Sequence, residues 1–385
     1  MPPEIADELR SELGIIEVAV ARGVTAERSR SRDATFEVWA QFREQFGKDA
    51  YLYNERNPTA WLLLYASRVR TGRLAKRGQP VRSRTVEEEV LAVATAHTLL
   101  GYKDPRHNEA GKIDYRLHLL YKAYAKEDPP PHRVKPIPIA LLVRAYNIAQ
   151  QRNTTKDAAI GDMMWIAFFF LCRPGEYTEK SEESAPFRAC DATLFMGELP
   201  LPYTLASRAS INSADFVTLE FTTQKNTVRG EVVGHGATRY PRACPVAAIK
   251  RRLLHLLEHE APPETSLCSY FHRKRWHEVK SSDITKLLRQ AAAELPQYNV
   301  RASDINARSL RASGAMALLC DMVDSDRIRL LGRWQSDEML RYLHLQARPV
   351  MQDFASRMLS GGNYSLLPSA PGQLLTSDTC EVPVA

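Results

Sequence analysis

The chain has 385 residues, of which 44% are hydrophobic and 25% charged, and its formal net charge is +7. This length allows two domains with separate hydrophobic cores, and the composition is ordinary for a globular protein. The longest apolar run, residues 163–172, is about half as long as a membrane-spanning helix needs to be, so the composition excludes a transmembrane protein.

The cysteines and the first residues bear on location. Six cysteines are scattered along the chain without a CxxC pair, which argues against a zinc site or a disulfide framework and fits a reducing compartment. The chain starts with MPPEIADELRSEL, which is acidic and polar, unlike a secretory signal. We expect no metal site and no secretion.

Residues 1–33 are expected to form a flexible N-terminal arm. A short amphipathic helix is predicted within residues 5–21, and RGVTAERSRSRD follows it. Arginine and serine alternate in this second stretch without apolar periodicity, which is typical of a mobile linker.

Residues 34–128 have helical periodicity throughout and predict a compact all-α domain. Phe36, Trp39, Phe42 and Phe46 recur at intervals of three, three and four, so they predict one buried helix face. Three more helices are predicted within residues 58–74, 83–101 and 112–127.

The positive charge is concentrated in this helical region. Residues 65–135 hold fifteen Lys or Arg against eight Asp or Glu, and residues 68–84 hold seven basic residues and no acidic one. A solvated loop or a localisation signal would explain such a run. Arg308 and Arg311, further along the chain, have the spacing expected of phosphate ligands, so a surface that faces a polyanion is favoured. The seven basic residues are Arg68, Arg70, Arg73, Lys76, Arg77, Arg82 and Arg84.

A proline-rich segment separates the two halves of the chain. Five prolines lie between residues 129 and 138, and consecutive prolines cannot continue a helix. We therefore expect a semi-rigid linker at 129–138, with a second, mostly helical domain at 139–359 and a flexible tail at 360–385.

Two basic residues occur next to predicted elements early in the second domain. Arg173 directly follows a helix that is apolar all round, as expected of a buried helix, and Glu176 lies three residues further on. Residues 215–236 alternate as a β-hairpin does, and Lys225 falls near its turn. A lysine at a hairpin turn is also common for solubility.

The stretch from Asp304 to His344 contains the largest number of candidate functional residues. Arg308 and Arg311 stand three residues apart at the start of a helical segment, so both guanidinium groups would share one helix face, and a planar guanidinium suits a phosphate. The motif LLGRWQSDEMLRYLH follows, with Trp334 at a turn and Tyr342 on the next predicted helix. A tyrosine in such a helix is also common as a packing residue.

This order of parts resembles the tyrosine recombinase (phage-integrase-like) family, whose C-terminal half contains [H/K]-x-x-R, then G-[H/W], then a nucleophilic tyrosine. The motif sequence GRWxSDxxLRYL most resembles that of recombinases of eukaryotic mobile elements, the DIRS, Ngaro and Crypton groups. Arg308 occupies the position that usually holds histidine, and Tyr342 follows Trp334 by eight residues, one fewer than in the family pattern.

The resemblance implies a mainly α fold, with a helical core-binding domain at 34–128 and a mixed α/β, mostly helical catalytic domain containing a small antiparallel sheet. It implies a catalytic set in which Tyr342 is the nucleophile and Lys225 the proton donor to the leaving oxygen. The remaining members neutralise or hold the phosphate: Arg173, Arg311, Arg308 and Trp334.

The same resemblance implies strand breakage and rejoining in double-stranded DNA without metal or other cofactor, self-association of the chain on DNA as a dimer or tetramer, and no membrane. The location would be nuclear in a eukaryote and cytoplasmic otherwise. Arg308 and the shortened Trp-to-Tyr spacing leave open a decayed or domesticated recombinase that binds DNA without cutting it. A type IB topoisomerase shares the chemistry, but the short N-terminal domain argues against it.

Overall fold

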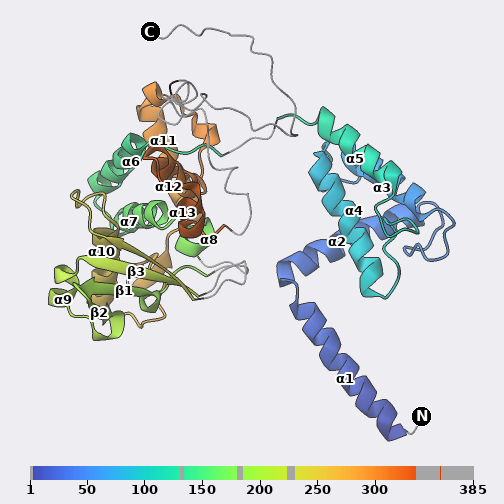
Figure 1. The fold of residues 1–385 in the computed structure, drawn as a ribbon, viewed down its shortest axis with the longest axis horizontal. Coiled ribbons are helices and arrows are strands. Elements are labelled where there is room, and N and C mark those ends of the chain that lie inside the picture. The colour runs from blue at the N-terminus through green and yellow to red at the C-terminus, as the bar shows by residue number, and fades with distance from the viewer. Residues whose placement is uncertain (1–2, 131–133, 180–184, 223–229, 335–355, 357–385) are drawn as a thin grey trace, which may run out of the picture.

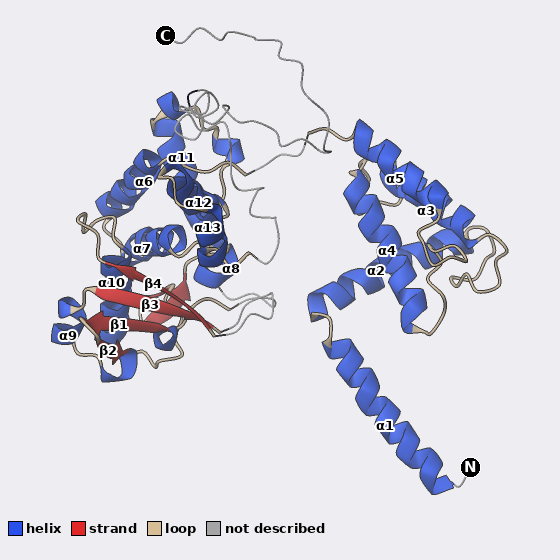
Figure 2. Cartoon of the chain, in the orientation of Figure 1, coloured by secondary structure: helices blue, strands red, loops and turns tan. Residues whose placement is uncertain are grey.

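The computed structural model describes residues 3–130, 134–179, 185–222, 230–334 and 356. The fold class predicted from sequence is confirmed: the chain is mainly helical with a small antiparallel sheet (Figures 1 and 2). The helices before the proline-rich segment are α1 (Pro3–Arg22), α2 (Ala26–Glu44), α3 (Pro58–Arg70), α4 (Ser83–Leu99) and α5 (Tyr115–Glu127).

Helices α2 to α5 pack together around a core rich in aromatic side chains. Trp39 and Phe42 are fully buried, and the Trp39 indole donates to the carbonyl oxygen of Ala50 at 2.7 Å. The prediction that Phe46 is a core residue is wrong. Helix α2 ends at Glu44, so Phe46 leaves the helix face and is 45% exposed, with the Arg68 guanidinium 5.1 Å from its ring centroid.

The predicted N-terminal arm is largely helical. Residues 3–22 form α1, in agreement with the helix predicted there, but the Arg/Ser stretch is helical too and forms the first turns of α2. Thr25 caps α2 by accepting from the main-chain N–H of Arg28 at 3.3 Å. Alanine and arginine are good helix formers, so one cap suffices to start the helix before its apolar face begins.

The end of the proline-rich segment is attached to the second half of the chain. Ile137 is buried in that core, and its main-chain N–H donates to the Ser313 hydroxyl at 2.7 Å. Lys135 pairs with Asp304 at 3.1 Å. Large clusters of buried apolar side chains lie within residues 39–117 and 137–310, and no described residue belongs to both. The domain boundaries stay a prediction.

Within the described residues, the second half contains helices and two small sheets. Its helices are α6 (Ile139–Arg152), α7 (Thr155–Phe169), α8 (Pro174–Tyr177), α9 (Arg208–Ser213), α10 (Pro245–Glu258), α11 (Ser281–Glu294), α12 (Ser309–Cys320) and α13 (Ser325–Leu331). Four single-turn 3-10 helices are η1 (Ala189–Asp191), η2 (Tyr203–Leu205), η3 (Pro296–Tyr298) and η4 (Ala302–Asp304).

The strands form a four-stranded antiparallel sheet and a separate hairpin. The sheet has the order β2-β1-β3-β4, and the hairpin pairs β5 with β6. The predicted hairpin at 215–236 is confirmed as β3 and β4. The strands are β1 (Ala192–Met196), β2 (Leu199–Pro202), β3 (Phe216–Phe221), β4 (Glu231–Gly236), β5 (Ser269–His272) and β6 (Arg275–Glu278).

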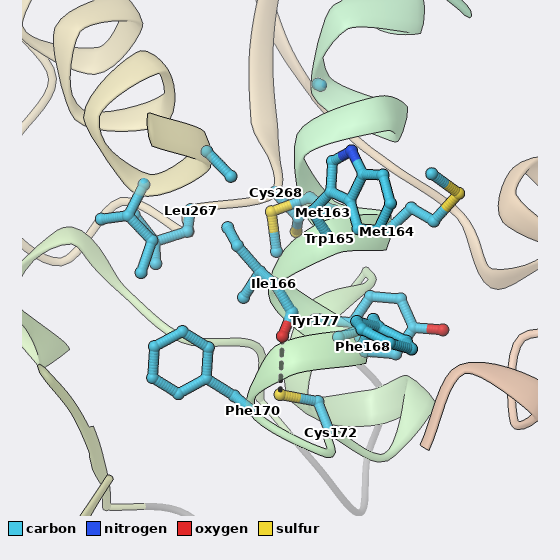
Figure 3. Packing of buried hydrophobic residues seen from close by; sticks show 14 of the residues in the cluster. Met163, Met164, Trp165, Ile166, Phe168, Phe170, Cys172, Tyr177, Leu267 and Cys268 are labelled. Carbon is cyan, nitrogen blue, oxygen red and sulfur yellow. Dashed lines mark hydrogen bonds between the residues drawn. The ribbon is translucent and has the colours of Figure 1, made fainter. Parts of the chain in front are cut away.

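Helix α7 is central to this half of the molecule. It packs against α6, α10, α11 and α12, so almost every side chain along it is buried, as its apolar sequence predicts (Figure 3). Because α7 is fixed on all sides, the residues that follow its C-terminal end are held in defined positions.

Candidate active site

The C-terminal end of α7 is closed by arginine side chains from distant parts of the chain. Leu171 has φ +47°, so the chain turns away there and its carbonyl oxygen, like that of Phe170, is available to side-chain donors. Arg311 Nη1 donates to the Leu171 oxygen at 2.6 Å, and Arg333 donates to the Leu171 and Phe170 oxygens, each at 3.2 Å. These cations also face the negative end of the helix dipole.

Arg311 reaches this position because α12 crosses α7 closely. A Cβ atom on Gly314 would lie 2.3 Å from the Phe168 oxygen, so only glycine permits this approach. The Arg311 side chain is buried, donates through Nη2 to the Gly332 carbonyl oxygen, and lies over the Trp334 ring at 4.2 Å. The guanidinium therefore joins α7, α12 and the turn after α13.

Glu176 holds the remaining guanidinium groups. It lies on α8 and is buried. Its carboxylate accepts from the main-chain N–H of Arg173 at 2.7 Å, from Arg173 Nη1 at 3.0 Å and from Arg333 Nη2 at 3.3 Å. Arg173, Arg311 and Arg333 thus carry three positive charges against one carboxylate, a net +2, and of these only Arg173 is partly exposed, at 28% of its side chain.

Arg333 is a member of the cluster that sequence reasoning missed. It has φ +55°, lies 3.5 Å above the Phe221 ring, and has a pKa lowered from its ordinary value by burial. The signal in the sequence is the motif GRW itself, in which this arginine lies between Gly332 and Trp334. Its partner Glu176 lies 157 residues earlier, beyond the reach of spacing arguments.

Phe221 also locates the hairpin that carries Lys225. It is the last residue of β3, and its contact with Arg333 places the base of the β3–β4 hairpin beside the arginine cluster. Lys225 itself lies outside the described residues. The same is true of the predicted nucleophile Tyr342.

Trp334 is buried, at 8% exposure, and packs with Leu171, Ala315 and Ile328. A Cβ on Gly332 would overlap the Trp334 ring at 1.5 Å, so the glycine of the motif makes room for the indole. The tryptophan therefore holds the turn after α13 against Arg311. Its predicted contact with phosphate remains a prediction.

Arg308 stands apart from the other arginines. It is the N-cap residue of α12, and its main-chain N–H donates to the Asn306 side chain at 2.8 Å. The Arg308 side chain is exposed. Within the described part of the chain its guanidinium has no hydrogen bond or ion pair, whereas that of Arg311 one turn later is fully engaged.

Two potential nucleophiles near the cluster are inaccessible. Cys172 and Tyr177 are both completely buried (Figure 3). The Cys172 thiol lies 3.9 Å from the Ile166 oxygen, and the Tyr177 hydroxyl donates to the Ala307 oxygen at 2.8 Å. Burial raises the pKa of both groups, so neither thiolate nor phenolate is available at this site.

The basic run predicted to bind DNA divides into engaged and free residues. Arg70 pairs with Asp128 and donates to the Val81 oxygen, so it ties α3 to the end of α5. Arg68 donates to Gln45 at 3.2 Å, Arg82 donates to the Pro130 oxygen at 3.3 Å, and Arg84 pairs with Glu88 at 2.9 Å. The loop between α3 and α4 carries the three that are exposed and have no partner among the described residues: Arg73, Lys76 and Arg77.

Neither a metal-binding cluster nor a membrane-spanning helix occurs among the described residues. No group of three or more of their His, Cys, Asp or Glu side chains could hold a metal ion. None of their helices is long and apolar enough to cross a membrane.

No protein-family model matches the chain, and no curated protein matches it. Solved structures do. The XerH site-specific recombinase bound to its difH substrate is 13% identical, with 85% of this chain and 78% of that chain covered and a TM-score of 0.47. The XerA recombinase is 12% identical (85% and 98% covered, TM-score 0.36), as is the Tn1549 transposon integrase bound to circular-intermediate DNA (83% and 97% covered, TM-score 0.41). All three TM-scores lie below 0.5, so the function proposed for this chain rests on its own residues.

Proposed function

We propose that the chain is a tyrosine recombinase that breaks and rejoins duplex DNA. The observation that carries the proposal is the arginine cluster around Glu176: Arg173, Arg311 and Arg333 come from three separate segments and converge at the end of α7. Arg173, Arg311 and Trp334 are residues that the sequence motif selects, and Arg311 and Trp334 are in contact. A fixed cluster with net positive charge suits the non-bridging oxygens of a phosphodiester.

The chemistry would proceed without an external energy source. The Tyr342 phenol loses its proton to solvent, and its oxygen attacks the scissile phosphorus to form a 3′-phosphotyrosine ester, while the bond to the 5′ oxygen breaks and Lys225 gives that oxygen a proton. A 5′ hydroxyl of the same or another strand then reverses the step. Phenols are poor nucleophiles at neutral pH, and the arginine field would stabilise the phenolate as well as the phosphate.

The rest of the proposal concerns the assembly. The helical region at 34–128 would bind DNA beside the catalytic domain at 139–359, and the exposed Arg73, Lys76 and Arg77 would contact its backbone. Strand exchange requires more than one active site, so copies of the chain would associate on DNA. A mobile-element origin, with a nuclear location in a eukaryote, fits the sequence of the GRWxSDxxLRYL motif.

A covalent-adduct assay tests the activity. Wild-type protein is incubated with a nicked duplex and analysed on a denaturing gel, and we expect a protein–DNA adduct. Tyr342→Phe removes only the hydroxyl, so it should abolish the adduct and retain DNA affinity. Tyr364→Phe is the matched control, because that tyrosine has no motif around it. An adduct that persists in Tyr342→Phe and disappears in Tyr364→Phe contradicts the assignment.

A second function is favoured by one specific observation. Both terminal nitrogens of Arg311 donate to main-chain carbonyl oxygens, and Arg308, at the usual histidine position, is exposed. This arrangement also suits a protein that retains the fold and the basic surfaces but binds DNA without cutting it. Stable DNA binding by the wild type with no adduct under any condition would select this alternative.

A further inference from the structure

The β5–β6 hairpin has a two-residue turn made of Arg273 and Lys274. Strand pairing runs from Ser269↔Glu278 to His272↔Arg275, which leaves only these two residues to connect the strands. Both have positive φ, +48° for Arg273 and +63° for Lys274. This is the backbone of the tight hairpin turn that Asn-Gly or Gly-Gly normally supplies.

The residue types at this turn are unfavourable for the fold. A side chain with a Cβ is strained in the left-handed region, and residues other than Gly, Asn and Asp rarely occupy it. A turn that needed only to connect two strands would contain glycine. Strained positions that persist in a structure tend to have a function, so the two cations at this tip require an explanation other than folding.

The charge of the tip is free to act on a partner. Arg273, Lys274 and the adjacent Arg275 are exposed, and none of them forms an ion pair or side-chain hydrogen bond within the described ranges. By contrast, the arginines at the end of α7 are engaged with a carboxylate or with carbonyl oxygens. The turn and the first residue of β6 thus carry three adjacent exposed cations, here called the tip.

Aromatic contacts support the hairpin close to its turn. Trp276 packs against Phe271 across the hairpin and against His255 and His259 of α10, with ring centroids 5.3–6.0 Å apart. The main-chain N–H of Phe271 donates to His255 Nε2 at 3.0 Å. This aromatic support fixes the direction of the turn, so its charges are preorganised.

The tip is distinct from the arginine cluster. The Thr155 hydroxyl, at the first residue of α7, donates to the Phe271 carbonyl oxygen at 3.3 Å. Arg173 follows the other end of α7, a helix of 15 residues that is about 22 Å long at the usual rise. The two groups of cations therefore lie at opposite ends of one helix.

We propose that the Arg273–Lys274–Arg275 tip is a second contact for the DNA backbone, separate from the site of cleavage. The inference rests on the proposed function, because it assigns the partner as duplex DNA. Preorganised cations on a rigid turn would bind phosphates of the same duplex at a distance from the scissile bond, independently of base sequence.

Two double variants of the turn separate charge from strain. Arg273→Ala with Lys274→Ala removes two charges and leaves the strained backbone, whereas Arg273→Asn with Lys274→Gly removes the same charges and relieves it. Binding to a labelled duplex of about 40 base pairs is measured over roughly 50–200 mM salt. Each pair should flatten the slope of log K against log salt by about 2. Only the Asn-Gly pair should raise the Tm, by roughly 2–4 °C.

A control variant loses equal charge elsewhere. Arg239→Ala with Lys286→Ala removes two exposed cations that lie outside residues 34–128 and have no ion pair among the described residues, and its slope should change less. Equal slopes in the wild type and both turn variants would contradict the proposed contact between the tip and DNA. A slope in the control that is as flat as in the turn variants would contradict it too. A wild type that does not bind the duplex overturns the tip and the proposed function together, whereas binding with intact slopes in the turn variants leaves the proposed function standing.

Discussion

The Arg311 guanidinium donates to the carbonyl oxygen of Leu171 at 2.6 Å, which joins residues 140 positions apart. The same side chain also donates to the Gly332 oxygen. Its planar fork thus serves two carbonyl groups, and the Leu171 oxygen also accepts from Arg333 at 3.2 Å. The residue that the motif identifies as a phosphate ligand is consequently also a structural link between α7 and α12.

Arg311→Lys should therefore be damaging despite the retained charge. A lysine has a single nitrogen and cannot bridge two carbonyl oxygens in the geometry of the fork. We expect a loss of roughly 1–3 kcal/mol in unfolding free energy, because a buried carbonyl loses its donor, and a fall of about 10² or more in adduct formation. Arg308→Lys is the matched control for stability, since that side chain is exposed on the same helix, and its Tm should barely change. Equal losses in both variants would contradict the linking role.

Gly314→Ala should separate α12 from α7. The new Cβ would lie 2.3 Å from both the Phe168 oxygen and the Leu171 side chain, so the helices must move apart. We expect a loss of about 1–3 kcal/mol, measured by chemical denaturation. Gly14→Ala in α1 is the control, because nothing lies within 4 Å of the position and alanine favours helix. That variant should gain about 0.5–1 kcal/mol. A tolerated Gly314→Ala would contradict the close crossing.

The buried His97 and the half-buried His255 predict acid sensitivity. Burial lowers the pKa of His97, and it lowers that of His255 to about 4. Each ring accepts a main-chain N–H through Nε2, from Leu52 and Phe271 respectively, so the neutral form is required. A depressed histidine pKa means that the unfolded chain binds more protons, so stability is full above about pH 6.5 and is lost as pH falls toward 4.

The measurement is Tm against pH between about 7 and 5, before most carboxylates titrate. His97→Gln supplies an amide that can accept from Leu52 and donate to the Val93 oxygen, the partner of His97 Nδ1 at 2.8 Å. Its Tm should fall less steeply in acid than that of the wild type. An unchanged pH profile in this variant would show that His97 does not contribute.

The loop between α3 and α4 should contribute sequence-independent binding. Replacing Arg73, Lys76 and Arg77 by alanine should flatten the slope of log K against log salt by roughly 2–3, about one for each phosphate that is no longer neutralised. Arg84→Ala should have little effect, because that guanidinium is already paired with Glu88. An unchanged slope in the triple variant would show that this loop faces away from DNA.

Periodicity and spacing predicted the helical regions, the β3–β4 hairpin and the buried α7, because these depend on local patterns of apolar residues. The resemblance to the recombinase motif selected Arg173 and Arg311, which the fold then brings together. Neither the resemblance nor the periodicity identified Arg333, since its role depends on a left-handed turn and on Glu176, which is distant in sequence. The strained turn at Arg273 was also missed, because its sequence lacks the glycine that marks such turns.

Arg308 is the position at which this chain departs from the motif. A histidine there could bind phosphate and also exchange a proton near neutral pH, whereas an arginine can only donate and keeps its charge. The side chain is exposed at the N-terminus of α12, so a change of residue type would not disturb the core. If Lys225 handles the proton, Arg308 needs only to neutralise phosphate.

Adduct formation by the wild type should then show no inflection between about pH 6 and 7, where an imidazole titrates. Arg308→His should remain active and should introduce such an inflection, because its charge is lost as the pH rises. Arg308→Ala should be strongly impaired at every pH, since no cation replaces it. The measurement is the initial rate of adduct formation on a nicked duplex across the pH range. If the wild type forms no adduct and Arg308→His restores it, the chain is a decayed recombinase that binds DNA, and the imidazole is the group that it has lost.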